Sequence, residues 1–154
     1  KENTEKFIFY NSDRYGFNND DNLWDNKIDI FLIGDSFAKG ACVSREDNIA
    51  SKLSSTLNKK IINLGMDGSG PLEQYASFLE YSGNYEFQLL IWTFTGSNDF
   101  VDFAQNKENL KLIKYLTDEK FRQDLVKNKN DIEKNFKIQK LKFDENIKNF
   151  SYNE

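Results

Sequence analysis

The sequence predicts an α/β domain built on a parallel sheet, and three observations point to it. Short apolar runs alternate with segments whose apolar residues recur at helical spacing. Each run ends in a glycine-containing turn, as strands do when they lead into a crossover helix. The runs at 28–33 and 88–95 are almost continuously apolar, which is typical of strands covered on both faces. These patterns favour a doubly wound, three-layer sheet of flavodoxin-like strand order, 2-1-3, with helices on both faces.

The individual elements follow from local signals. Strands are predicted over 28–33, 60–64 and 88–95, and helices over 46–58 and 71–82. Ser44, three residues before Asp47, is expected to cap the first helix. Pro71 suits the first turn of the second helix. We expect the inner face of that helix to carry Leu72, Tyr75, Ala76 and Leu79.

The segments outside this core predict a wrapping strand and a helical arm. Residues 1–27 predict a short edge strand at Phe7 to Tyr10 and a loop that wraps the sheet, with Trp24 as its anchor. From 107 onward, a short helix, a break at Thr117-Asp118 and a long helix over 119–150 are expected. The predicted organisation is a wrapping segment (1–27), an α/β core (28–106) and a helical arm or lid (107–154). We expect the arm to pack on a missing segment or on another subunit.

Composition narrows the classes of protein to which this chain could belong. A chain of 154 residues suits one domain, and 15% aromatic residues favour a packed core. A net charge of −4 without a basic cluster argues against nucleic-acid binding. No apolar stretch approaches the ~18 residues of a membrane span. Cys42 is the single cysteine, histidine is absent and acids are scattered, so we expect no disulfide, no metal and no cofactor.

Polar side chains and glycines follow all three predicted strands. Gly34-Asp35-Ser36 follows the first strand, a glycine-rich turn at 65–70 follows the second, and Gly96-Ser97-Asn98-Asp99 follows the third. The carboxyl ends of parallel strands meet at one edge of a sheet, where ligands bind in doubly wound folds. A hydroxyl, an exposed backbone amide and a side-chain amide at that edge are the parts of an acyl-transfer site.

Over residues 28–99 the three blocks resemble the SGNH (GDSL-type) hydrolase family. The first block matches Gly34-Asp35-Ser36 with Gly40, the second matches Asn63 through Gly68, and the third matches Gly96 to Asp99. The resemblance implies a serine ester hydrolase or acyl transferase with Ser36 as nucleophile. The amides of Ser36 and Gly68 and the side chain of Asn98 would form the oxyanion hole. The implied substrate is an acyl ester of a small molecule or carbohydrate, or a lipid, and the sequence does not choose among them.

The resemblance also bears on the cellular compartment in which the protein is found. The segment from Arg14 to Trp24 is similar to what precedes the first block in some bacterial envelope-associated members. The lone cysteine is compatible with a secreted as well as a cytoplasmic protein, so the sequence leaves the location open.

The family's fourth block, Asp-x-x-His, has no counterpart in this chain. Without a base a serine hydroxyl is a poor nucleophile. Three accounts stay open: the chain is the N-terminal part of a longer enzyme with two further strands, it is an inactive binding or scaffolding domain, or Asp35 acts as an unusual base. We otherwise expect Asp35 and Asp99 to be structural, capping helix amides or bonding loop backbone. The chain by itself is expected to be inactive.

Overall fold

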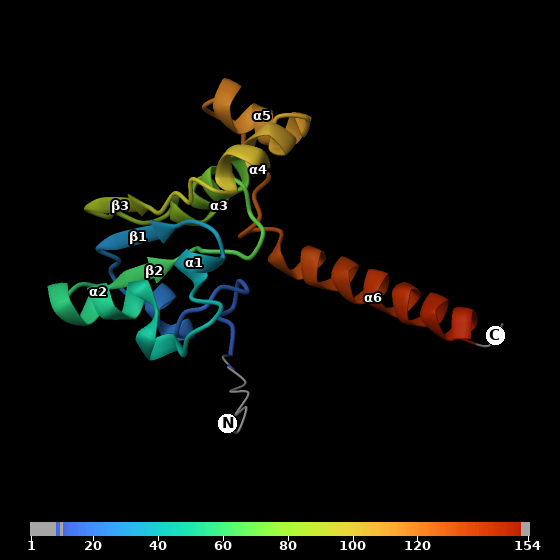
Figure 1. Ribbon diagram of the computed structural model, residues 1–154, viewed down its shortest axis with the longest axis horizontal. Coiled ribbons are helices and arrows are strands. Elements are labelled where there is room, and N and C mark those ends of the chain that lie inside the picture. The colour runs from blue at the N-terminus through green and yellow to red at the C-terminus, as the bar shows by residue number, and fades with distance from the viewer. Residues whose placement is uncertain (1–8, 10, 152–154) are drawn as a thin grey trace. The chain divides into compact units, whose positions relative to one another are not determined.

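Three parallel strands form the sheet of the computed structural model, which describes residue 9 and residues 11–151, with side chains as far as residue 144. β1 (Ile30–Ile33) lies between β2 (Ile61–Asn63) and β3 (Leu89–Trp92), as Figure 1 shows. Phe31 is in register with Ile62 on one side and Leu90 on the other. The predicted strand order 2-1-3 is therefore confirmed, and each strand is shorter than its predicted range.

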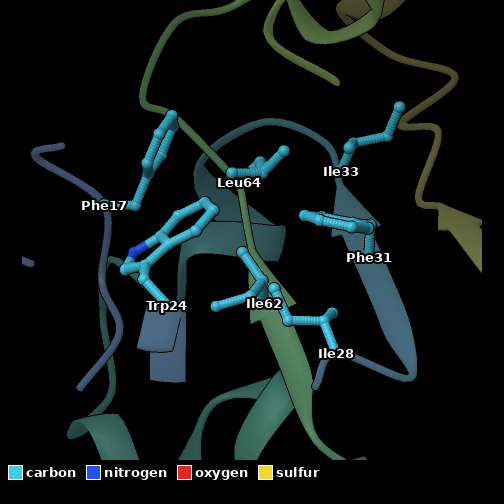
Figure 2. Packing of buried hydrophobic residues seen from close by; sticks show 7 residues of the cluster. All are labelled: Phe17, Trp24, Ile28, Phe31, Ile33, Ile62 and Leu64. Atoms are coloured by element: carbon cyan, nitrogen blue, oxygen red, sulfur yellow. The ribbon is translucent and has the colours of Figure 1, made fainter. Parts of the chain in front are cut away.

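Helices cover the two faces of the sheet. Residues of α3 (Pro71–Ser82) pack on the face formed by Phe31, Ile33, Ile62 and Leu64, part of which Figure 2 shows. α2 (Ile49–Leu57) contributes Ala50 and Leu53 to the opposite face, where they meet Ile30, Leu32 and Ile61. The prediction of helices on opposite faces is confirmed. This is the arrangement that right-handed crossovers give.

The third strand departs from expectation. The prediction that both faces of the 88–95 run are covered is wrong, because Leu89 is 50% exposed and Trp92 is 42% exposed. All four residues of β1, in contrast, are buried. β3 is an edge strand, and among the described residues no further strand lies beside it.

The segment before the sheet wraps onto β2. Its 3₁₀ helix, η1 (Asp21–Asp25), carries the buried Trp24, so the predicted anchor is confirmed. The predicted edge strand at Phe7 to Tyr10 lies outside the described residues, except for Phe9. In Figure 2 the rings of Phe17 and Trp24 lie beside Ile62 and Leu64.

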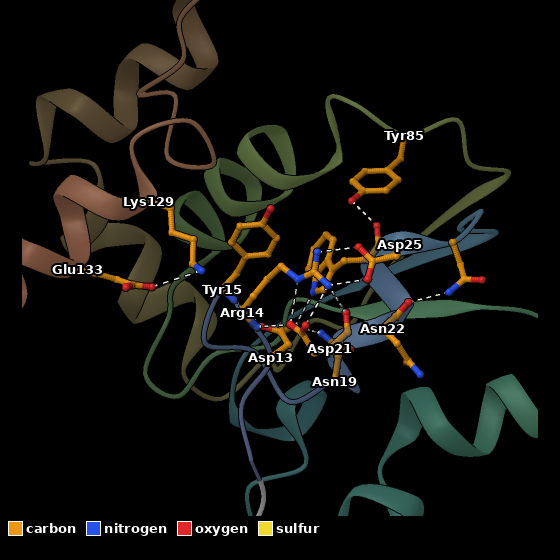
Figure 3. A network of polar contacts seen from close by, with 12 residues as sticks. Asp13, Arg14, Tyr15, Asn19, Asp21, Asn22, Asp25, Tyr85, Lys129 and Glu133 are labelled. Carbon is orange, nitrogen blue, oxygen red and sulfur yellow. Dashed lines mark hydrogen bonds and ion pairs between the residues drawn. The ribbon is translucent and has the colours of Figure 1, made fainter.

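Asp13 organises this segment through both carboxylate oxygens. Oδ1 accepts the backbone N–H groups of Tyr15 and Phe17, each at 2.9 Å. Oδ2 accepts Asn19 Nδ2 and Trp24 Nε1, each at 2.8 Å, and Figure 3 shows this network. Asp13 therefore pairs four donors of this segment and fixes its local backbone conformation.

Arg14 ties the same segment together on its outer side. Its guanidinium lies 2.9 Å from Asp21 Oδ2 and 2.7 Å from Asp25 Oδ1, as Figure 3 shows. The hydrogen bond from Arg14 holds the pKa of Asp25 below its usual value. The two carboxylates are exposed, so we assign little stability to the pairs themselves.

The predicted helix over 46–58 is wrong at its start. A 3₁₀ helix, η2 (Arg45–Asp47), ends at Asn48, and α2 begins at Ile49. Asn48 Oδ1 accepts the N–H of Ser51 at 2.8 Å, whereas the Ser44 side chain bonds Asp47 and caps no backbone amide. Asparagine is as good a cap as serine, so the later residue sets the boundary.

The predicted inner face of α3 packs against another helix. Leu72 and Ala76 are buried with Leu112 and Tyr115 of α5 (Leu110–Thr117), and Tyr75 and Leu79 lie beside them. Phe78 and Tyr81 are the α3 side chains that face the sheet. The helix is therefore apolar on two sides.

Two further helices, at 99–106 and 110–117, belong to the same compact unit as the sheet. α4 (Asp99–Asn106) was not predicted, and α5 lies on α3. The chain divides into two compact units, Lys1–Arg122 and Gln123–Glu154, and α5 lies within the first of them. Within the second unit, α6 (Lys129–Ser151) begins ten residues later than predicted.

α6 carries exposed apolar side chains, among them Phe136, Leu141 and Phe143. Lys129 and Glu133 form an ion pair along it at 3.4 Å. That the arm packs on a further segment or subunit stays a prediction. Over residues 9 and 11–151, no helix is both long and apolar enough to cross a membrane.

Candidate active site

Ser36 begins the short helix α1 (Ser36–Lys39) just beyond the carboxyl end of β1. Asp35 occupies the N-cap position, where its Oδ1 accepts the N–H of Phe37 at 2.9 Å. Ser36 is half-buried, and within the described part of the chain neither its hydroxyl nor its N–H has a hydrogen-bond partner. The first block therefore presents a hydroxyl and an amide that are both available to a ligand.

The turn after β2 contacts the first block directly. Met66 N donates to Gly34 O at 3.2 Å, and Ser69 Oγ lies 3.3 Å from the same oxygen. Lys39, three residues after Ser36, forms an ion pair with Asp67. One backbone hydrogen bond, one hydrogen bond from a side chain to the backbone and one ion pair thus hold the second block against the first.

Gly68 stands at the exposed tip of this turn. Its φ is +66°, a conformation that favours glycine, and open space surrounds the position where a Cβ would stand. Its N–H donates to no acceptor among the described residues. Gly68 consequently offers a backbone amide at the same edge of the sheet as Ser36.

The third block meets the first through side chains. Asn98 lies at the N-cap position of α4 and is half-buried. Its Nδ2 lies 3.3 Å from Asp35 Oδ2 and 3.2 Å from Asp102 Oδ2. Asn98 is therefore next to the first block, but its amide donates to two carboxylates. A role in an oxyanion hole requires the amide to turn away from them.

The two acids that flank the site have structural roles, as predicted. Asp35 is buried and caps α1. Asp99 is buried as well, and its Oδ2 accepts the backbone N–H of Thr95 in the turn after β3. Both carboxylates stabilise the loops that carry Ser36 and Asn98.

The sequence did not reveal two residues that connect the blocks. Gln74 of α3 is fully buried, and its Nε2 donates to Ser69 O at 2.8 Å while its Oε1 accepts Trp92 Nε1 at 2.7 Å. Asp102 Oδ2 accepts a hydrogen bond from Asn98 Nδ2, the same nitrogen that donates to Asp35. A polar residue on an apolar helix and an acid one turn after Asn98 were the available signals, and neither indicates its partner.

The site holds no arrangement suited to a metal. Among the described residues, no group of three or more His, Cys, Asp or Glu side chains could bind a metal ion.

The chain matches no protein-family model, no curated protein and no solved structure. The assignment to a reaction class consequently depends on the residues and contacts described above.

Proposed function

We propose that this chain supplies the nucleophile and oxyanion-hole donors of an SGNH-type serine ester hydrolase or acyl transferase. The observation that carries the proposal is the state of Ser36, a half-buried residue at the carboxyl end of β1 whose hydroxyl and N–H are both unbonded within the described chain. The unbonded, exposed amide of Gly68 lies in a turn that contacts the same block.

The proposed reaction begins when Ser36 Oγ attacks the carbonyl carbon of an acyl ester and gives its proton to a base. Negative charge then develops on the carbonyl oxygen, and the amides of Ser36, Gly68 and Asn98 stabilise it. One such donor contributes about 3 kcal/mol in comparable sites. Cleavage of the ester C–O bond releases the alcohol, which takes up the proton, and leaves acyl-Ser36. Water then completes hydrolysis, or an acceptor hydroxyl completes transfer.

The base is the missing part, because the chain contains no histidine. Asp35 fits the role poorly, since one of its oxygens accepts Phe37 N–H and the other accepts the Asn98 amide. We propose that a histidine outside these 154 residues acts as base. Loss of the base costs roughly 10⁶ in rate in a well-studied serine hydrolase. The chain alone should therefore hydrolyse esters barely above background.

The test uses the parent reading frame with any downstream Asp-x-x-His block and aryl esters of acetate and butyrate. We expect turnover that Ser36→Ala reduces to background, and fluorophosphonate labelling at Ser36. Ser55→Ala, which removes an exposed serine on α2, is the matched control and should leave turnover unchanged. Turnover that survives Ser36→Ala would overturn the proposal.

A catalytically inactive binding or scaffolding domain is the alternative. Two observations favour it: the absence of histidine and the engagement of the Asn98 amide by Asp35 and Asp102. In that case the longer protein is inert and unlabelled, yet it binds an O-acetylated sugar in calorimetry. Asn98→Ala would then change the affinity for this sugar.

A further inference from the structure

A polar hollow lies between the wrapping segment and α2, away from the three blocks that follow the strands. Its volume is about 270 Å³, and its lining includes Asn18 and Asn19 of the wrapping segment and Asn48 and Ser51 at the start of α2. Ile61 of β2 is an apolar part of the same lining. Small-molecule sites have volumes of about 300–1,000 Å³. The hollow is therefore of a size for one small ring and not for a long chain.

The asparagines of the wrapping segment are held in place without a ligand. Asn18 Nδ2 donates to Lys39 O at 2.9 Å, and Asn18 Oδ1 accepts Arg45 Nε at 3.1 Å. Asn19 Nδ2 donates to Asn63 O at 2.9 Å, and Asn19 Oδ1 accepts Asn63 N–H at 2.8 Å. Both asparagines are buried. A preformed wall of this kind reduces the entropy that is lost when a ligand binds.

Asn48 supplies the hollow with a hydrogen-bond donor that the protein does not use. The residue is 2% exposed, and its Oδ1 accepts Ser51 N–H at 2.8 Å. Its Nδ2 has no partner among the described residues. Over that part of the chain, Asn106 Oδ1 is the one buried side-chain nitrogen or oxygen without a hydrogen-bond partner. Asn48 Nδ2 is consequently in contact with solvent, and the hollow is the space that Asn48 lines.

The orientation of the Asn48 side chain is fixed on two sides. Its Oδ1 is the N-cap of α2, so a rotation of the amide that brought Nδ2 to another acceptor would break the cap. On the other side α1 ends against it, because a Cβ at Gly40 would lie 2.5 Å from Asn48 Cβ. Gly40 has a φ of +77°, which favours glycine at this position. The free donor is therefore held in one place.

The lining as a whole favours a neutral ligand. Arg45 and Asp20 are its charged residues, and they pair with each other at 2.5 Å. The Ser51 hydroxyl has no partner within the described chain, and Ala50 and Ile61 are apolar and buried. A charged ligand would lose its hydration here without meeting an unpaired counter-charge. A hydroxyl group, in contrast, both donates and accepts, as these neutral side chains require.

We propose that this hollow binds a neutral, hydroxyl-rich ligand of the size of a single sugar ring. Asn48 Nδ2 donates to one ligand hydroxyl, and the Ser51 hydroxyl forms a second hydrogen bond. The C–H groups of the ring pack on Ala50 and Ile61, which removes apolar surface from water. The lining includes none of the three candidate active-site residues, so this inference is independent of the acyl-transfer proposal.

The experiment titrates the 154-residue chain with the methyl glycosides of glucose, galactose and N-acetylglucosamine and follows amide shifts by NMR. We expect saturable shifts of the Asn48 side-chain amide and of the Ser51 N–H with at least one of the three. Asn48→Asp keeps an oxygen for the cap and replaces the donor by an acceptor. This variant should bind about tenfold more weakly or worse. Ser51→Ala, which leaves the cap intact, should weaken binding several-fold.

Asn109→Asp is the matched control for the change of cap. Asn109 caps α5 through its side-chain oxygen, as Asn48 caps α2, and it lies outside the hollow. The variant adds the same charge to the chain and should bind the sugar as the parent does. A loss of affinity in Asn109→Asp equal to that in Asn48→Asp would contradict a contact with Asn48.

Charged sugars test the assignment to a neutral ligand. Glucose 6-phosphate and glucuronate should bind no more tightly than the neutral glycosides. If either binds more tightly, the hollow is an anion site at Arg45 and the proposal is wrong. The absence of saturable shifts with all three glycosides at millimolar concentration would overturn it as well, and so would binding that survives both Asn48→Asp and Ser51→Ala.

Discussion

The side-chain amide of Asn98 donates to the carboxylate of Asp35, with 3.3 Å between Nδ2 and Oδ2. The same nitrogen lies 3.2 Å from Asp102 Oδ2. One neutral amide therefore stands between two acids at the carboxyl edge of the sheet, and Asp35 is buried. The contact gives the candidate site an electrostatic property that can be measured without a substrate.

Asn98→Asp would place a third carboxylate in this position. We expect it to lower the free energy of unfolding at neutral pH by about 1–2 kcal/mol more than Asn98→Ala does. Both variants remove the donor, and only Asn98→Asp adds a charge that the neighbouring carboxylates repel. Urea denaturation measures the difference. Equal stabilities at neutral pH would contradict the contact.

Gly34→Ala tests the close approach of β1 and β3. A Cβ at Gly34 would lie 2.0 Å from Thr93 Oγ1, and the φ of +154° adds backbone strain. We expect a loss of about 2–3 kcal/mol in the free energy of unfolding. Gly96→Ala is the control, since a Cβ there meets nothing within 4 Å. It should change stability by less than about 1 kcal/mol.

Asp13→Ala removes the acceptor for four donors in the wrapping segment. We expect a loss of about 3 kcal/mol, because several of the donors are buried and would stay unsatisfied. Asp21→Ala removes an exposed partner of Arg14 and should cost at most about 1 kcal/mol. Thermal and urea unfolding compare the two variants. Similar losses would show that Asp13 does not organise the segment.

Because Tyr81 is largely buried, we predict that the free energy of unfolding falls in alkali. Burial raises the pKa of Tyr81 from 10.0 to about 12. The unfolded chain loses this proton first, so the contribution of Tyr81 is complete below pH 10 and is lost as pH rises toward 12. Tyr81→Phe should therefore unfold less steeply with pH over this range. Tyrosinate absorbance of the parent should show a late-titrating group, and its absence would contradict the prediction.

The sequence predicted the strands and α3 well because their signals are local. Apolar runs ending in glycine turns marked the three strands, and Pro71 marked the start of α3. The start of α2 was wrong because Ser44 and Asn48 are both good caps, and only the tertiary fold selects between them. The covering of β3 was wrong for a different reason. A continuous apolar run indicates that a strand requires burial and does not identify what covers it.

Only those residues of the candidate site that directly follow strands could be predicted from the sequence. Ser36, Gly68 and Asn98 follow strands and lie in loops that contact one another, directly or through Gly34 and Asp35. Gln74 connects two of these loops from α3, through contacts 18 and 25 residues apart that no local pattern encodes. Asp102 bonds Asn98 from one helical turn away, and that spacing alone does not indicate the contact. The reaction itself stays a prediction, since it depends on a base that the chain does not contain.

The wrapping segment has a consequence for the order of folding. Asp13 gathers donors no more than 11 residues away, while the Asn19–Asn63 contact spans 44 residues. Short loops cost less entropy to close, so contacts of low sequence separation form early. We therefore expect the segment from Asp13 to Trp24 to organise early and to dock once β2 is in place. Its docking would then be the late step that completes this edge of the sheet.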